Sequence, residues 1–283
     1  MIPVTQTIAP PAAPAAPAKL PSAFRLSLSR AAIETRMFFR EKDAVIFTFS
    51  FPIILLVIFG SIFAAELEGT GLNVSQLYVA GLIGSATMTG FQNLGIGISM
   101  DRDDGTLKRL AGTPMPRTAY FAGKALNTLL VSSVQVAVLL AIGVAMFELE
   151  LPSTVSSWLT FTWVFVLGVL GSSLLGIAVS SLPRSGKSAS AVIAMPFVVL
   201  QFISGVFIPI DQLPEWLTRI ASFFPLKWMC QGFRAVFLGD DGATLELAGS
   251  YELDRVALIL GAWVIGGLVL CLTTFRWKGR RDG

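Results

Sequence analysis

The triplet Gly186-Lys187-Ser188 is the part of this sequence that comes nearest to a catalytic motif. The phosphate-binding loop of nucleotide hydrolases ends in Gly-Lys-Ser or Gly-Lys-Thr and holds phosphates between a strand and a helix. That loop needs another glycine five residues before the second one, and Ser181 stands there. The triplet also lies in a short turn between two long apolar stretches. We therefore predict that the chain does not hydrolyse ATP, and that Lys187 marks a helix end facing lipid phosphates.

Acid-base and metal chemistry also lack their usual residues. The sequence contains no histidine, and every Asp and Glu lies in a loop or at the end of an apolar stretch. Transporters driven by protons need carboxylates or imidazoles within the membrane, so this class is disfavoured. We expect no catalytic residue, no metal site and no cofactor bound by this chain.

The polar side chains within the apolar stretches are amides and hydroxyls. Such groups either hydrogen-bond between helices or line a translocation path, and the sequence leaves both roles open. The candidates for the path are Gln92, Asn93, Asn127 and Gln201.

Residues 101–117, DRDDGTLKRLAGTPMPR, carry seven charged side chains between two long apolar stretches. Thr106 can cap a short helix, and the aspartates before it suit the positive end of the helix dipole. Leu107 and Leu110 form an apolar pair three residues apart, and a glycine and two prolines end the helix. Such a helix can dock in a groove of a partner; the alternative is a solvated loop that fixes topology. The residues assigned to docking are Asp101, Asp104, Gly105, Thr106, Leu107, Lys108, Arg109, Leu110 and Pro114.

The elements that must position these residues are membrane-spanning helices. Hydrophobic residues make up 54% of the chain and charged residues only 14%, unlike a soluble domain. A hydrocarbon core about 30 Å thick needs roughly 20 helical residues to cross it. Uncharged stretches of that length are Ala44–Ala65, Gly69–Met100, Ala125–Phe147, Leu151–Pro183, Ser188–Ile210 and Val256–Phe275. We predict an all-α polytopic membrane protein with six transmembrane helices in residues 44–275.

The segments before and after these stretches have different compositions. Residues 1–21 are rich in Pro and Ala, which predicts a disordered cytosolic tail, and residues 276–283 form a short basic tail. In residues 22–43 the apolar side chains of Phe24, Leu28 and others share one helical face, which predicts an amphipathic interfacial helix. The basic residues expected at lipid phosphates are Arg25, Arg30, Arg36 and Arg40. The first apolar stretch is as long as a full span, so we expect it to stay in the mature protein rather than to act as a signal peptide.

Two short amphipathic pieces follow the fifth apolar stretch and run to Gly239. They are too short to cross the membrane but too apolar for water, which predicts a re-entrant helical hairpin in the outer leaflet. The residues that mark it are Pro214, Trp216, Pro225 and Trp228.

The positions of the basic residues predict the orientation. All but four of the 21 Lys and Arg residues face the cytosol if the N-terminus is cytosolic, which places both termini inside the cell membrane. The net charge of +3 reflects this bias and does not indicate nucleic-acid binding. Cys230 and Cys271 then lie on opposite sides of the membrane, so we predict no disulfide between them.

The string DRDDGTLKRLAGTPMPR resembles the cytosolic coupling-helix segment of permease subunits of the ABC type-2 exporter class. In that class an acidic stretch, Gly-Thr-Leu, a charged pair, Leu and Thr-Pro follow the second span in this order. The basic amphipathic helix, the six spans and PEWLTRIASFFPLKWMCQGFRAVFLG agree with the same class, from about Ser22 onward. This chain has Asp where members often have Glu, which keeps the charge. The overall resemblance is to daunorubicin-resistance-type permeases.

This resemblance implies a transport subunit rather than an enzyme. It implies two permease copies, identical or related, and two separate ABC ATPase subunits that bind ATP and Mg and dock the coupling helices. The amphipathic helix would pack on the ATPase or only anchor the chain, and the hairpin would lie beside the substrate exit or only cap the fold. The uncharged interior favours export of a lipophilic drug, antibiotic or lipid. A polysaccharide or lipid-linked glycan exporter is the alternative within the class, and a passive channel or membrane scaffold is the alternative outside it.

Overall fold

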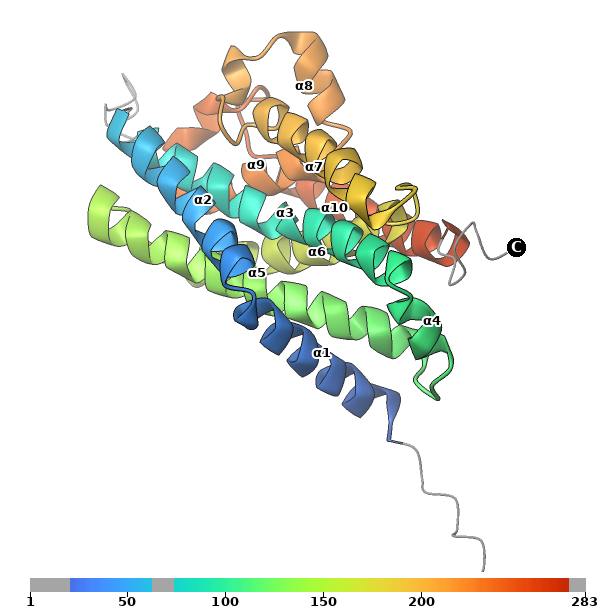
Figure 1. The fold of residues 1–283 in the computed structure, drawn as a ribbon. Helices are drawn as coiled ribbons and strands as arrows, with labels where there is room; N and C mark the ends of the chain where they lie inside the picture. The colour runs from blue at the N-terminus through green and yellow to red at the C-terminus, as the bar shows by residue number, and fades with distance from the viewer. Residues whose placement is uncertain (1–20, 63–73, 275–283) are drawn as a thin grey trace, which may run out of the picture.

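The computed structural model describes residues 21–62 and 74–274, and helices joined by turns make up this part of the chain (Figure 1). The helices are α1 (Ala23–Arg40), α2 (Lys42–Ile62), α3 (Val74–Asp103), α4 (Thr106–Ala111), α5 (Arg117–Phe147), α6 (Val155–Val179), α7 (Gly186–Ile203), η1 (Ile210–Gln212), α8 (Glu215–Ala221), α9 (Pro225–Phe237), η2 (Asp241–Leu245) and α10 (Leu253–Thr274). The predicted tails, 1–21 and 276–283, lie outside the described residues except for Pro21. The all-α prediction is confirmed for the described part.

Five of these helices are long and apolar enough to cross a membrane: α2, α5, α6, α7 and α10. Each corresponds to one of the predicted apolar stretches. Several bounds differ by a few residues, and two of the larger differences follow from a proline and a glycine. Pro116 has the dihedral angles of a residue that precedes a helix, so α5 begins at Arg117 and not at Ala125. Gly205 has a φ of +81°, which turns the chain just after α7 ends at Ile203.

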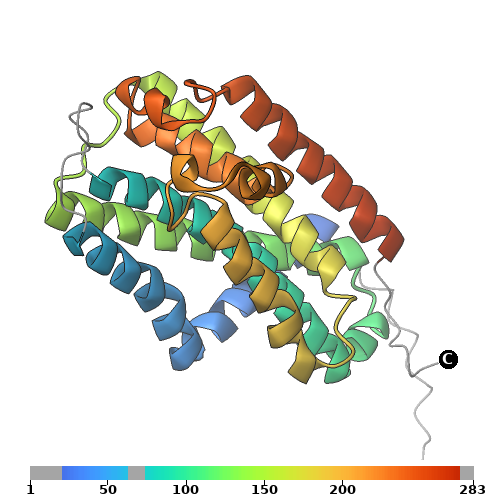
Figure 2. The ribbon, with the colours of Figure 1, turned by 90° about the horizontal axis from the view of Figure 1, so that it is seen from above.

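The remaining predicted stretch, Gly69–Met100, forms α3 from Val74 onward, and residues 69–73 lie outside the described residues. Helix α3 is 30 residues long but is not among the five apolar helices. It lies at the centre of the bundle, in contact with α2, α5, α6, α7 and α9 (Figures 1 and 2). Every residue from Ser75 to Met88 is buried. A helix that faces protein on most sides needs small and polar side chains for packing more than apolar ones for lipid, which explains its lower hydropathy.

Glycines bring the neighbouring helices close to α3. A Cβ atom on Gly176 of α6 would lie 2.7 Å from the carbonyl oxygen of Phe91, and one on Gly84 would lie 2.7 Å from Sγ of Cys230. Neither distance is tolerable between non-bonded atoms, so a larger residue at either position would push α6 or α9 away from α3.

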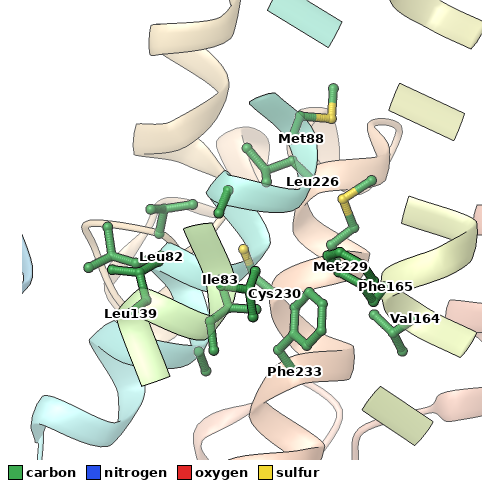
Figure 3. Packing of buried hydrophobic residues seen from close by; sticks show 14 of the residues in the cluster. Leu82, Ile83, Met88, Leu139, Val164, Phe165, Leu226, Met229, Cys230 and Phe233 are labelled. Atoms are coloured by element: carbon green, nitrogen blue, oxygen red, sulfur yellow. The ribbon is translucent and has the colours of Figure 1, made fainter. Parts of the chain in front are cut away.

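The two helices of the predicted hairpin differ from each other. Helix α8 is largely exposed, with only Thr218 and Ala221 buried, and the Trp216 side chain is 62% accessible. Helix α9 is buried at every residue except Ala235 and contacts α3, α6 and α10. Figure 3 shows its side chains among those of α3 and α6. Helix α9 is therefore part of the bundle core, and the position of the two pieces in the outer leaflet stays a prediction.

Candidate functional site

The charged segment forms a corner between two long helices, and Figure 1 shows α4 between the end of α3 and the start of α5. Helix α4 spans Thr106–Ala111, as expected. The predicted cap is wrong, because Gly105 with a φ of +74° precedes the helix and no side chain caps it. Thr106 instead accepts a hydrogen bond from Arg109 at 3.0 Å. We call residues 99–124, with the α6–α7 turn at 180–186, the α4 corner.

Leu107 turns toward the inside of the α4 corner. Its side chain is only 1% exposed and packs in a cluster with Ile98, Tyr120 and Ile177, while Leu110 lies partly buried beside it. The expectation that Leu107 offers apolar surface to a partner is therefore wrong, whereas docking through the partly exposed Leu110 stays a prediction. The sequence showed that α4 is amphipathic, but α3 and α5 bury the apolar face within the chain.

The opposite face of α4 is exposed and polar. Asp104, Lys108 and Arg109 are exposed, and so are residues 111–114, which include Pro114. The exposed surface of α4 is therefore mainly charged and continues into the Gly-Thr-Pro turn, while Leu107 holds the helix to the bundle.

Asp101 belongs to the last turn of α3, and its carboxylate does not face the start of α4. It accepts a hydrogen bond from the Tyr120 hydroxyl at 2.6 Å and pairs with the Lys124 ammonium at 2.9 Å. Lys124 also pairs with Glu34 of α1 at 3.1 Å. One ammonium group on α5 therefore joins the end of α3 to α1.

Arg30 completes this charge cluster, which consists of Arg30, Glu34, Asp101, Tyr120 and Lys124. Its guanidinium pairs with Glu34 and lies 5.2 Å from the centre of the Tyr120 ring. The side chains of Arg30, Glu34 and Lys124 are 13% exposed or less. Arg30 is therefore directed at protein and not at lipid phosphates, whereas Arg25, Arg36 and Arg40 are exposed.

The sequence reading missed Glu34, Tyr120 and Lys124. Two cations and two carboxylates balance in the cluster, which offsets the cost of removing them from water. A signal for Lys124 was present, since it is an isolated cation immediately before an apolar run. Its partners come from residues 90 and 23 positions away, and no local pattern identifies such pairs.

The α6–α7 turn binds the last turn of α3. Arg102 donates to the carbonyl oxygens of Ser180 at 2.8 Å and Pro183 at 3.2 Å, and Asp103 accepts from the Gly186 amide at 3.1 Å. Ser185 and Ser188 cap each other at the start of α7. The triplet Gly186-Lys187-Ser188 is thus the first turn of a capped helix whose N-terminus already faces a carboxylate, and Lys187 is exposed there.

Comparison with known proteins identifies the family. A model of the ABC-2 type transporter family matches residues 25–238, which include the whole α4 corner. The chain belongs to the ABC-2 type transporter family. It is a multi-pass transport permease, and the family implies partnership with an ABC ATPase.

Several relatives of this ABC-2 chain are named as permeases. "Putative transport permease ycf38" of Porphyra purpurea is 27% identical over 232 residues, covering 77% of this chain and 78% of the relative. "Inner membrane transport permease YadH" of Escherichia coli is 24% identical over 214 residues, covering 73% and 80%. "Probable multidrug ABC transporter permease YbhR" of Escherichia coli is 24% identical over 177 residues, 62% of this chain but only 47% of that relative.

The four polar residues considered for the path of this ABC-2 permease do not come together. Gln201 is buried and accepts a hydrogen bond from Ser85 of α3 at 2.9 Å, and Asn127 accepts one from Thr35 of α1 at 2.9 Å. These two amides join helices. Gln92 is half-buried and Asn93 is exposed, so both lie on the side of α3 that its neighbours leave open.

The hairpin residues of this permease have structural roles. Pro214 immediately precedes α8, and Pro225 is the first residue of α9, where a missing amide proton costs nothing. The buried Trp228 donates its indole N–H to the Ser222 carbonyl at 2.8 Å. Cys230 is buried and Cys271 partly buried, and both thiols are free, as predicted.

Proposed function

We propose that this chain is the membrane subunit of an ATP-driven exporter whose ATP and Mg sites lie on separate ABC ATPase subunits. The observation that carries the proposal is the division of α4 into two faces. Leu107 anchors the helix in the bundle, while Asp104, Lys108 and Arg109 remain exposed for a partner. A short helix held in this way moves together with the helices that it touches.

The charge cluster supplies the connection that such a mechanism needs. A displacement of the α4 corner moves Asp101. Because Lys124 of α5 pairs with both Asp101 and Glu34 of α1, the displacement also exerts a force on α5 and α1. Packed helices and ion pairs switch between discrete arrangements rather than deform continuously, so the corner can bias the bundle between inward-open and outward-open states.

We propose six membrane crossings, with α3 as the sixth, and both termini in the cytosol. Thirty residues of α-helix extend about 45 Å, which exceeds the hydrocarbon core of about 30 Å. The excess length of α3 and α5 would carry the α4 corner beyond the lipid core and into reach of an ATPase. The basic residues around the corner favour the cytosolic side.

The open side of α3 suggests how a path forms. Gln92 and Asn93 face away from the bundle, and a second copy of the chain, identical or related, would enclose them between two permeases. The uncharged lining favours a lipophilic drug, antibiotic or lipid as substrate, and a polysaccharide or lipid-linked glycan is the alternative.

Co-purification with an ABC ATPase tests the proposal. The chain is co-expressed with an ABC ATPase from the same genome and purified by its own tag, as wild type and as Lys108→Glu with Arg109→Glu. We expect the ATPase to be retained by the wild type and lost from the double variant, with equal permease in the membrane fraction. Arg219→Glu, a reversal at an exposed cation of α8, is the matched control.

The same purified complex, reconstituted in vesicles, distinguishes an ATP-driven exporter from a passive channel. ATP-dependent loss of a fluorescent lipophilic dye from vesicles supports export, whereas flux that is independent of ATP identifies a passive channel. Full retention of the ATPase by the double variant would refute the role given to α4.

A further inference from the structure

A cavity of about 520 Å³ lies at the other end of the bundle from the α4 corner. It is open on one side and is bordered by α9, the segment after η2 and the start of α10, which runs beside α9 (Figure 2). The last turn of α10 carries Cys271, which packs near Leu107, so the 22 residues of α10 separate the two sites by roughly 30 Å.

Lys227 of α9 lines this cavity and is 6% exposed. Its ammonium donates to the amide oxygen of Gln231 and lies 3.7 Å from the centre of the Trp228 ring. Gln231 is held in turn by its own bond to the Tyr251 carbonyl at 2.8 Å. Within the described part of the chain, Lys227 forms no ion pair and donates to no other acceptor.

The carboxylates at this cavity already have partners. Glu246 pairs with Arg234 at 2.6 Å, and Glu252 pairs with Arg255 at 2.5 Å. Arg234 does not itself line the cavity, but it neutralises Glu246 from behind the wall, so Lys227 is the cation that these ion pairs leave over. A buried ammonium with neither counterion nor full hydration is costly, and an anionic ligand would remove that cost. The desolvation lowers the pKa of Lys227 from 10.5 to about 8, which leaves it mostly protonated at neutral pH.

The rest of the cavity wall is largely apolar. Leu258 of α10 is 70% exposed, Leu247 is 60% exposed, and Ile259 and the Trp228 indole lie beside them. Leu258 and Ile259 are about one helical turn further along α10 than Arg255. The cavity thus places a cationic group next to an apolar wall that continues along a membrane helix.

We propose that this cavity binds an anionic amphiphile, with its phosphate or carboxylate at Lys227 and its hydrocarbon chain along Leu258 and Ile259. Bilayer phospholipid supplies such a group together with its chains, whereas a free anion supplies only the charge. The apolar wall favours the amphiphile. The site is independent of the α4 corner, and its test does not require an ATPase.

Native mass spectrometry of the purified full-length chain in neutral detergent tests the site. Phosphatidylglycerol and phosphatidylcholine are added in separate titrations, and inorganic phosphate is added in a third. We expect retention of phosphatidylglycerol, weaker by about tenfold for Lys227→Gln because one charge-assisted contact is lost, and restored by Lys227→Arg. Leu258→Asn, at an exposed position that the fold does not need, should weaken lipid retention without removing the charge.

Control variants and competition decide the outcome. Lys187→Gln removes an exposed cation far from the cavity and should bind phosphatidylglycerol as the wild type does. Equal retention by Lys227→Gln and the wild type would overturn the proposal. Displacement of the lipid by millimolar inorganic phosphate, with Leu258→Asn unaffected, would show a site for free anions and overturn the amphiphile.

Discussion

One side chain, Lys124, joins three helices at the α4 corner. Its ammonium lies between Asp101 of α3 and Glu34 of α1, and its side chain is 8% exposed. Removing one partner of a buried charge pair leaves the other charge without compensation, which typically costs about 3–5 kcal/mol. We therefore expect Lys124→Met to lower the unfolding temperature of the purified chain clearly. Lys187→Gln, at an exposed lysine, should leave it unchanged.

A double variant tests whether Lys124 and Glu34 interact directly. Glu34→Gln combined with Lys124→Met removes one charge of each sign, so it should lose less stability than the sum of the two single changes. Additive losses would contradict a direct interaction between Lys124 and Glu34.

Lys227 predicts two opposite responses to pH. Burial lowers its pKa to about 8. The neighbouring charges act in both directions, since Glu246 and Glu252 raise this pKa and Arg234 and Arg255 lower it. The unfolded chain binds more protons than the folded one between pH 8 and 10.5, so the contribution of Lys227 to stability rises over that range. Retention of phosphatidylglycerol should instead fall above pH 8, because the ammonium loses its charge while the lipid phosphate keeps its own. Parallel melting and lipid-retention curves from pH 7 to 10 check both signs, and Lys227→Arg should abolish the fall.

At the scale of the element, α4 is a six-residue helix whose two faces have separate tasks. Leu107 is buried, and truncating a buried leucine costs about 2–5 kcal/mol. Leu107→Ala should therefore lower the unfolding temperature, while Lys108→Ala, on the exposed face, should not. Melting of both variants by intrinsic fluorescence provides the measurement. Equal stability of the two variants would mean that α4 is not anchored through Leu107.

The sequence predicted helices better than it predicted their neighbours. The apolar runs located α2, α5, α6, α7 and α10 because lipid imposes both length and composition on a span. Periodicity also identified α4 as amphipathic, but it contains no information on which element covers Leu107. The same limit applies to α9, whose burial against α3, α6 and α10 no local pattern predicts. The partners of Lys124 follow from the packing of α1 on α5, which is a tertiary property.

On the scale of the whole molecule, the two proposed sites, the α4 corner and the cavity at Lys227, lie at opposite ends of the bundle. Helix α3 runs between them and contacts both α4 and α9. Its buried half packs against α9, and its last turn holds the α4 corner. Close contacts at Gly84 and Gly176 leave little space for sliding, so movement at one end would pass along α3 as a rigid unit. The side of the membrane that the α4 corner faces therefore decides whether a cytosolic ATPase can reach it.

Single cysteines can test that orientation. Cys230 is fully buried, and burial raises the pKa of its thiol to about 12, so it should not react on either side and need not be removed. In a background with Cys271→Ser, Ser250→Cys places a thiol in the exposed turn before α10, and Ala111→Cys places one at the exposed end of α4. Because the basic residues predict a cytosolic α4 corner, a membrane-impermeant maleimide should label Ser250→Cys in intact cells, but Ala111→Cys only after permeabilisation. Labelling of Ala111→Cys in intact cells would place α4 outside, where no ATPase could reach it, and would refute both the topology and the coupling role.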